Sequence, residues 1–213
     1  MTGDVPNDRG ARPGAGSAVL EEPMARFAAL LREANGVDRV RLPEPTAFSL
    51  ATVSADGQPS VRILLLKGVD ERGFVFYTNY ESRKGRELLG ASRAGMCFHW
   101  QPLEVQVRVD GMVEPVSGAE ADAYFASRER GSQIGAWASM QSRPIAPPGE
   151  LDRRVAEFTA KFEGQQVPRP PHWSGFRLVP TAIEFWKNMP SRLHERHRYV
   201  KVGSGWSVTT LYP

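Results

Sequence analysis

The sequence predicts a mainly β fold with peripheral helices, built as a small antiparallel barrel. Short segments of alternating apolar and polar residues dominate the chain, and turn residues separate them at hairpin spacing. Helical patterns are inserted between these segments, which favours a barrel over a βαβ sheet. The sequence has no Gly-x-Gly-x-x-Gly or Walker-type loop, which argues against a Rossmann or P-loop nucleotide site.

The first half of the chain begins with a polar, Gly- and Pro-rich tail. We expect residues 1–20 to be disordered and residues 21–213 to form a single domain. A helix should begin near Pro23 and end at Gly36. The strand pattern then predicts strands at 47–53, 61–66, 74–78, 94–100 and 104–115, with a short helix from Ser82 through Leu89.

The second half returns first to helices and then to strands. Ser117 and Glu120 have capping-box spacing, which predicts a helix through about Arg128. Further helices are expected at 132–139 and 150–163, followed by a Pro-rich extended connector at 167–171. The last strands are expected near 175–179, 182–187, 195–201 and 205–211.

Composition narrows the class of protein. With 41% hydrophobic and 24% charged residues, the chain can bury a core. Apolar runs such as Ile63–Leu66 are too short to cross a membrane, and the N-terminus has no signal-peptide pattern. Cys97 is the single cysteine, so no intramolecular disulfide can form and a cytoplasmic location is expected.

The histidines and the charged residues argue against a metal-binding protein and against a nucleic-acid-binding protein. Among the four histidines, His194 and His197 alone are close in sequence, so we expect no metal site. The net charge is +3, with Lys and Arg in short clusters rather than one basic run. This pattern favours anionic small molecules over nucleic acid as partners.

Two clusters in the first half carry candidate binding residues. Arg62 and Lys67 bracket an apolar strand, and on a regular strand residues five apart face opposite sides. That cluster is equally consistent with an ordinary strand with charged ends. Arg83 and Lys84 follow the expected cap Ser82, where cations oppose the helix dipole unless an anion is bound. This second cluster therefore predicts an anion site at a helix N-terminus.

A third cluster lies near the C-terminus. Arg192, His194 and Arg196 alternate, so on a strand they would share one face. Cationic groups on one face repel each other unless a carboxylate, a phosphate or an electron-rich ring lies among them. An exposed strand with no function is the alternative.

Together these clusters resemble the pyridoxine (pyridoxamine) 5′-phosphate oxidase family. The resemblance runs from about residue 45 to the C-terminus, in the order and spacing of the family. The matching stretches are Arg62–Lys67, Gly73–Lys84, Gln106–Val109, Tyr124–Arg128, Ser132–Ser142, Val167–Trp173, Ile183–Trp186 and Arg192–His194.

The resemblance implies a split β-barrel homodimer, a Greek-key-like antiparallel barrel with two FMN sites at the subunit interface. The FMN-binding positions it implies are Arg62, Ile63, Leu64, Leu65, Leu66, Lys67, Tyr77, Thr78, Arg83, Lys84, Gln106, Gln141, Ser142, Trp186 and Arg196. The substrate-binding positions are Lys67, Tyr124, Arg128, Ser132, Arg192, Leu193 and His194.

The implied activity is oxidation of pyridoxamine and pyridoxine 5′-phosphates to pyridoxal 5′-phosphate, with O2 reduced to H2O2. The residue types suit this chemistry, because a phosphate needs an arginine and hydroxyls such as Arg128 and Tyr124. These two residues, four apart, would lie on one helix face. The flavin would carry the redox step. Arg192 and His194 are therefore expected to be catalytic by orienting the substrate.

Several positions depart from the family pattern. Val105 replaces an arginine, Lys187–Asn188 replace Gln-Gly, and Thr210 replaces a second arginine. An Arg-x-x-Tyr segment that covers the substrate in relatives has no clear counterpart in residues 1–22. The alternatives are therefore a sibling FMN oxidase of the phenazine-biosynthesis type and, in another class, a non-catalytic flavin- or pyridoxal-phosphate-binding module.

Overall fold

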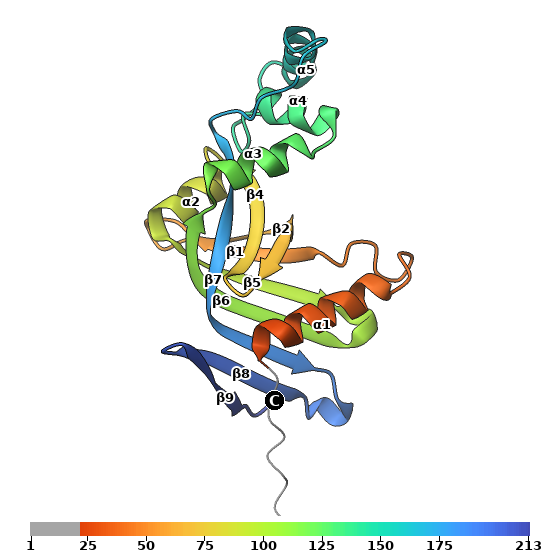
Figure 1. The fold of residues 1–213 in the computed structure, drawn as a ribbon, viewed down its shortest axis with the longest axis vertical. Coiled ribbons are helices and arrows are strands. Elements are labelled where there is room, and N and C mark those ends of the chain that lie inside the picture. Colours follow the sequence, from red (N-terminus) through yellow and green to blue (C-terminus); the bar gives the residue numbers. More distant parts are fainter. Residues whose placement is uncertain (1–21) are drawn as a thin grey trace, which may run out of the picture.

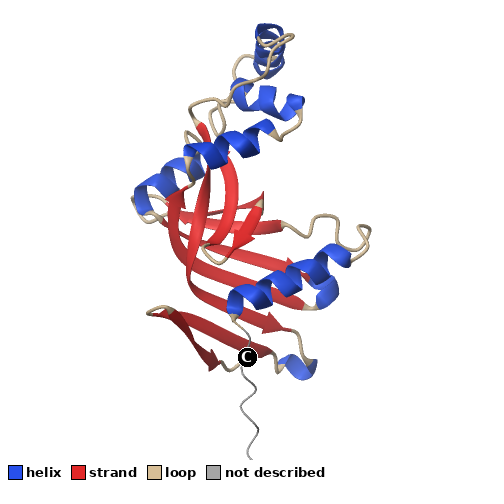
Figure 2. Ribbon diagram, in the orientation of Figure 1, coloured by secondary structure: helices blue, strands red, loops and turns tan. Residues whose placement is uncertain are grey.

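The computed structural model describes residues 22–213, so the expected tail at 1–20 and most of the segment 1–22 lie outside it. Its strands form one nine-stranded antiparallel sheet in the order β2-β1-β5-β6-β7-β4-β3, and β8 pairs with β7 and β9 (Figure 2). The strands are β1 Ala47–Val53, β2 Pro59–Leu65, β3 Gly68–Asp70, β4 Gly73–Asn79, β5 Arg93–Trp100, β6 Val105–Pro115, β7 Trp173–Lys187, β8 Glu195–Val202 and β9 Gly205–Thr210.

Five α-helices lie around this sheet within the described residues. Two short 3₁₀ turns, η1 Gln101–Leu103 and η2 Pro190–Arg192, join strands. The helices are α1 Pro23–Gly36, α2 Arg83–Ala91, α3 Gly118–Ala126, α4 Arg130–Ala138 and α5 Glu150–Lys161. The expectation of a mainly β fold with helices at the periphery is confirmed.

The segment 59–70 closes the sheet toward a barrel. Its first part, β2, pairs with β1, and its last part, β3, pairs with β4 at the other end of the strand order. The backbone N–H of Leu66 donates to Thr46 at 2.8 Å, and the N–H of Lys67 donates to Val75 at 2.8 Å. One continuous stretch of chain therefore joins the two edges of the sheet.

Aromatic residues fill the inside of the curled sheet. Phe27 of α1 is completely buried, and its ring centroid lies 4.8 Å from that of Phe74 and 5.0 Å from that of Phe98. Edge-on aromatic packing of this kind adds stability beyond the buried area. This contact holds α1 against the strands.

Helices α3, α4 and α5 form one end of the molecule, and the β8–β9 hairpin forms the opposite end (Figure 1). The helical end has its own apolar cluster, in which Phe125, Ile134 and Phe162 pack with Trp173 from the start of β7. Strand β7 therefore runs from the helical end towards the hairpin and connects the two ends.

Two elements differ from the sequence expectation. Strand β7 is continuous where two strands were expected, because a bulge opposite Asp110 and Gly111 accommodates Pro180, which cannot donate to the ladder. A side chain at Gly111 would lie 2.3 Å from the carbonyl oxygen of Val179, so only glycine fits there. The short strand β3 was not expected, since three residues carry too little pattern.

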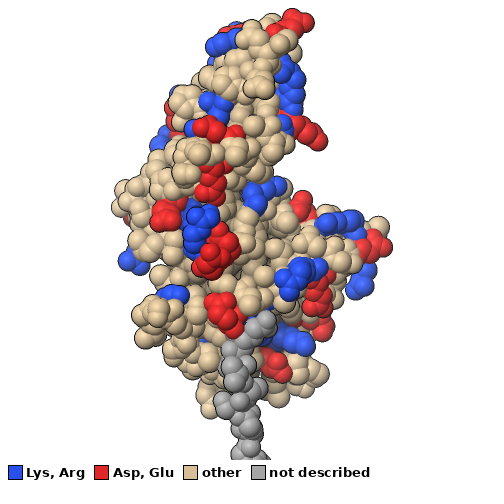
Figure 3. All heavy atoms as spheres, viewed as in Figure 1, with Lys and Arg blue, Asp and Glu red and all other residues tan. Residues whose placement is uncertain are grey.

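The surface carries mixed charges. On the face shown in Figure 3, Lys and Arg side chains are interspersed with Asp and Glu side chains. Within residues 22–213, no helix is long and apolar enough to cross a membrane.

Candidate active site

A cavity of about 540 Å³ is lined by the sheet (β2, β4 and β7) and by helices α2, α3 and α4 with their adjoining loops. Cavities that bind small molecules in proteins measure roughly 300–1,000 Å³. It gathers these residues expected from the sequence: Arg62, Ile63, Leu64, Leu65, Lys67, Tyr77, Thr78, Lys84, Tyr124, Arg128, Ser132 and Gln141.

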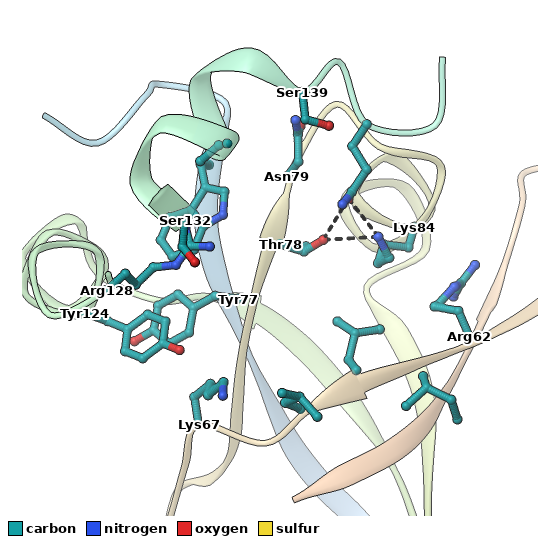
Figure 4. A pocket seen from close by; sticks show the side chains of 17 residues that line it. Arg62, Lys67, Tyr77, Thr78, Asn79, Lys84, Tyr124, Arg128, Ser132 and Ser139 are labelled. Carbon is teal, nitrogen blue, oxygen red and sulfur yellow. Dashed lines mark hydrogen bonds between the residues drawn. The ribbon is translucent and has the colours of Figure 1, made fainter. Parts of the chain in front are cut away.

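One end of the cavity, here called the Lys84 end, consists of Arg62, Thr78, Lys84 and Gln141. The Lys84 ammonium lies 2.9 Å from Oε1 of Gln141 and 3.3 Å from the Thr78 hydroxyl (Figure 4). Burial, together with the positive charge of Arg62, lowers the pKa of Lys84. An anion bound here would compensate that charge, so this end suits a phosphate.

Helix α2 brings Lys84 to this end. The Ser82 side chain caps the helix by accepting a hydrogen bond from the backbone of Gly85 at 3.2 Å. A side chain at Gly85 would lie 2.4 Å from the carbonyl oxygen of Tyr80, so the tight entry to the helix requires glycine. The expected cap and helix are confirmed.

A buried carboxylate lies behind Arg62. Glu87 accepts hydrogen bonds from the Thr52 hydroxyl at 2.5 Å and from Arg62 at 3.4 Å. Arg83, expected at the FMN site, does not line the cavity, because its Nε donates to Glu87 at 2.8 Å. Sequence reasoning missed Thr52 and Glu87, which no motif marks.

The opposite end of the cavity, here called the Arg128 end, consists of Lys67, Tyr124, Arg128 and Ser132. The Arg128 guanidinium lies 4.7 Å from the centre of the Trp173 ring. Its Nη1 is buried, and no acceptor among residues 22–213 bonds to it. Burial lowers the pKa of Arg128. A buried donor without an acceptor is rare in folded proteins, and a bound ligand is one explanation.

Stacked aromatic rings support the Arg128 end. The Tyr77 ring stacks on Tyr124 at 3.9 Å between centroids and on Trp173 at 5.4 Å. Figure 4 shows the Tyr77 and Tyr124 rings lying side by side next to Arg128. Burial raises the pKa of Tyr77 to about 12, so its hydroxyl stays protonated at neutral pH.

Two expectations about these residues were wrong in detail. Arg62 and Lys67 line the same cavity, because β2 ends at Leu65 and the chain turns before Lys67. Arg128 lies beyond the end of α3 at Ala126 and does not share a helix face with Tyr124, although both still line the cavity.

Two further expected residues lie beside the cavity rather than on its wall. Leu66 is buried, 5% exposed, and packs into the core. Ser142 lines an adjoining hollow with Gln141 and has a left-handed backbone conformation. Sequence reasoning did not single out five residues on the cavity wall, namely Asn79, Gly135, Ala136, Ser139 and Trp173.

The remaining expected residues form a second group, here called the Trp186 cluster: Gln106, Trp186, Arg192, Leu193, His194 and Arg196. On the sheet, Gln106 of β6 and Arg196 of β8 are the two cross-strand partners of Trp186. The His194 ring lies 4.5 Å from the Trp186 ring.

The expected strand at 195–201 is confirmed as β8, but it does not include Arg192 and His194, so the shared strand face suggested for Arg192, His194 and Arg196 was wrong. Pro190 opens the turn η2, in which Ser191 and Arg192 have positive φ, and β8 begins only at Glu195. A strand cannot include such residues, so alternation along the sequence does not put the three side chains on one face. The turn is closed by the N–H of Met189, which donates to Nδ1 of His194 at 3.3 Å.

The Trp186 cluster does not reach the cavity of its own chain. Trp173, at the start of β7, lines the cavity, whereas Trp186 lies 13 residues further along the same strand, about 43 Å of strand at ~3.3 Å per residue. The residues after β7 lie at the end of the molecule opposite to α3 and α4 (Figure 1). One chain therefore holds two separate groups of candidate site residues.

Two family models match separate parts of the chain. Residues 38–162 match the family model "Pyridoxamine 5′-phosphate oxidase", and residues 173–213 match "Pyridoxine 5′-phosphate oxidase C-terminal dimerisation region". The second match contains most of the Trp186 cluster.

Relatives cover nearly the whole chain. A pyridoxine/pyridoxamine 5′-phosphate oxidase of Myxococcus xanthus is 58% identical over 192 residues, covering 90% of this chain and 92% of the relative. One from Cupriavidus taiwanensis is 55% identical over 198 residues, covering 92% of both.

Among solved structures, PhzG from Burkholderia lata, bound to tetrahydrophenazine-1-carboxylic acid, superposes with a TM-score of 0.83. It is 34% identical and covers 90% of this chain and 93% of its own. An FMN-binding protein of Nostoc punctiforme, 18% identical with a TM-score of 0.68, shares the fold, with 89% of this chain and 96% of its own covered. The chain belongs to the pyridoxamine 5′-phosphate oxidase family.

Proposed function

We propose that this chain is an FMN-dependent oxidase that converts pyridoxamine 5′-phosphate and pyridoxine 5′-phosphate to pyridoxal 5′-phosphate, with O2 as acceptor and H2O2 as second product. The observation that carries the proposal is one cavity with two cationic ends, the Lys84 end and the Arg128 end. A flavin phosphate and a substrate phosphate are two anions, and each end suits one of them.

The residues present fit FMN. At the Lys84 end, Arg62 and Lys84 would hold its phosphate together with the Thr78 hydroxyl, and the lowered pKa of Lys84 supports an anion there. The strand from Ile63 to Leu65 would form a wall for the ring system. The cofactor, when bound, supplies the acceptor for a hydride from the substrate.

The substrate phosphate fits the Arg128 end. The buried Nη1 of Arg128, which has no acceptor among residues 22–213, supplies a donor, and Lys67, Tyr124 and Ser132 add a cation and two hydroxyls around the same end. Holding the phosphate at this end would place the pyridine ring between the two ends of the cavity, where its reacting carbon can meet the cofactor.

The Trp186 cluster would complete the site of a second copy of the chain in a homodimer. This follows from the separation of the two groups in one chain and from the match to a dimerisation region at 173–213. Because Nδ1 of His194 accepts a hydrogen bond from Met189, the proton of the neutral ring lies on Nε2. His194 would thus orient the substrate as a donor, and Arg192 would act beside it as a cation.

The first experiment is aerobic turnover of both phosphates by FMN-loaded protein, with aldehyde and peroxide followed together. Equal amounts of both products are the expected result. A yellow protein that turns over neither substrate would contradict the proposal and favour a phenazine-type oxidase, the alternative represented by the Burkholderia lata neighbour. The cations and hydroxyls of the Arg128 end argue for a phosphorylated substrate instead. The cytoplasmic location stays a prediction.

A further inference from the structure

Glu184 is a buried carboxylate on the face of the sheet that carries the Trp186 cluster. It is 8% exposed and lies on β7 between Arg108 of β6 and Arg198 of β8, its two cross-strand partners. A buried carboxylate is retained at a cost in desolvation unless it is paired, so its partners matter.

Its main partner is Arg196, a member of the Trp186 cluster. Both Nε and Nη2 of Arg196 lie 2.8 Å from Oε1 of Glu184. The third nitrogen, Nη1, donates to the carbonyl oxygen of Tyr212 at 2.9 Å. The other oxygen of Glu184 faces Arg108 at 3.7 Å. The guanidinium of Arg196 is thus held on two sides, and its plane is fixed.

We infer that Glu184 is a positioning residue: together with the Tyr212 carbonyl, it holds Arg196 in the orientation that binds the flavin ring in the cavity of the partner subunit. The inference rests on the proposed function. Arg196 faces Trp186, which pairs in turn with Gln106, so an indole, an amide and a guanidinium lie in one row across the sheet. Such a row suits the flat ring and its acceptors rather than the phosphate, which the Lys84 end takes.

Without Glu184, Arg196 would lose its fixed geometry. Arg108 and Arg198 would then repel it without a compensating charge, and its long side chain would move among several rotamers. The ring of oxidised flavin is uncharged, so removal of the carboxylate brings no offsetting attraction for it. We therefore expect weaker flavin binding from Glu184→Gln.

The test measures dissociation constants for FMN and for riboflavin, which lacks the phosphate, by quenching of flavin fluorescence. Glu184→Gln should raise both constants by a similar factor, about tenfold, because the lost hydrogen bonds are charge-assisted. Lys84→Ala, at the Lys84 end, should raise the dissociation constant for FMN and leave that for riboflavin nearly unchanged. The matched control is Glu195→Gln, an exposed neighbour of Arg196 that forms no ion pair with any described residue.

A double-mutant cycle separates positioning from a merely structural role. If Glu184 acts through Arg196, then Glu184→Gln should add nothing to the affinity loss of Arg196→Ala. The same added loss in both backgrounds, or no loss in the wild-type background, would overturn the inference.

A second variant covers the case in which Glu184→Gln does not fold. Deleting Tyr212 and Pro213 removes one acceptor of Arg196 and leaves the sheet pairings in place. This deletion should weaken the binding of FMN and riboflavin by a smaller factor than Glu184→Gln does. Unchanged affinities would contradict the inference. Wild-type protein that binds no flavin would instead contradict the proposed function.

Discussion

At the scale of single residues, the buried donor of Arg128 sets the expectation for substrate binding. Its Nη1 has no acceptor among residues 22–213, and its guanidinium is fixed over the Trp173 ring. A donor that is already desolvated and oriented gains most from a ligand phosphate, because little reorganisation is needed.

Arg128→Ala should therefore lower kcat/KM for the phosphorylated substrates by about 10- to 100-fold, the loss expected for a charge-assisted hydrogen bond. FMN binding should be retained, because Arg128 lies at the other end of the cavity from Lys84 (Figure 4). Steady-state kinetics and the flavin absorbance of the purified protein measure the two effects. Arg32→Ala, an exposed arginine on α1, is the control, and an equal loss there would discredit the assignment.

Glu87 links stability to pH. Burial acts to raise its pKa, but hydrogen bonds from Thr52 and Arg83 and the charges of Arg83 and Arg62 outweigh it and lower the pKa below the ordinary 4.5. The unfolded chain then binds the proton at higher pH than the folded one. The stabilisation is complete above pH 4.5 and is lost as pH falls through the lowered pKa.

Glu87→Gln should lower the free energy of unfolding by about 1–3 kcal/mol at neutral pH, and the difference from wild type should shrink in acid. Urea unfolding at several pH values measures this. Glu163→Gln, an exposed site, should follow the wild-type curve throughout. A difference that stays constant with pH would show that the charge of Glu87 is not involved.

At the scale of elements, helix α2 offers a matched pair of glycines. Gly85 has no room for a Cβ, which would lie 2.4 Å from a backbone oxygen, whereas Gly90 in the same helix has open space around it. Because alanine favours a helix over glycine, replacing Gly90 by alanine should stabilise the protein, whereas the lack of space at Gly85 should make the same replacement destabilising there.

Gly90→Ala should stabilise the protein by about 0.5–1 kcal/mol. Gly85→Ala should destabilise the protein by about 1–3 kcal/mol, the usual range for forced overpacking. It should also weaken FMN binding, because it displaces Lys84. Thermal unfolding and FMN titration measure both effects. Equal stabilisation by both substitutions would contradict the conclusion that Gly85 has no room for a side chain.

Elements with a strong local signal could be predicted from sequence. Pro23, Ser82 and Ser117 mark helix starts that the structure confirms, because capping depends on neighbouring residues only. The turn at Arg192 and the unbroken β7 could not be predicted. Ser191 and Arg192 adopt positive φ without a glycine or asparagine to mark the turn, and the bulge at Thr181 that accommodates Pro180 in β7 depends on pairing with the distant strand β6.

At the scale of the whole molecule, the two groups of site residues lie at separate places in one chain. Sequence motifs named most residues of both groups, but not their distance from each other, because residue spacing along the chain does not encode a sheet order. The proposed homodimer resolves this separation by pairing the cavity of one chain with the Trp186 cluster of the other.

Mixed dimers test that arrangement. Arg128→Ala and Arg192→Ala chains should each be nearly inactive alone. After joint unfolding and refolding, the mixture should recover about a quarter of wild-type turnover, since about half of the dimers are mixed and a mixed two-fold dimer keeps one of its two sites intact. If the mixture stays as inactive as its components, each site is formed within a single chain. Mixing two Arg128→Ala samples is the control.

The joint at Leu66 and Lys67, where one stretch of chain passes from one sheet edge to the other, has a further consequence. Its two amides bond to different neighbours, Thr46 and Val75, so their hydrogen-exchange rates report separately on fraying of each edge. Lys67 also lines the cavity. A ligand that contacts Lys67 should slow hydrogen exchange at both amides. The two edges of the barrel would then open less often in the ligand-bound protein than in the ligand-free protein.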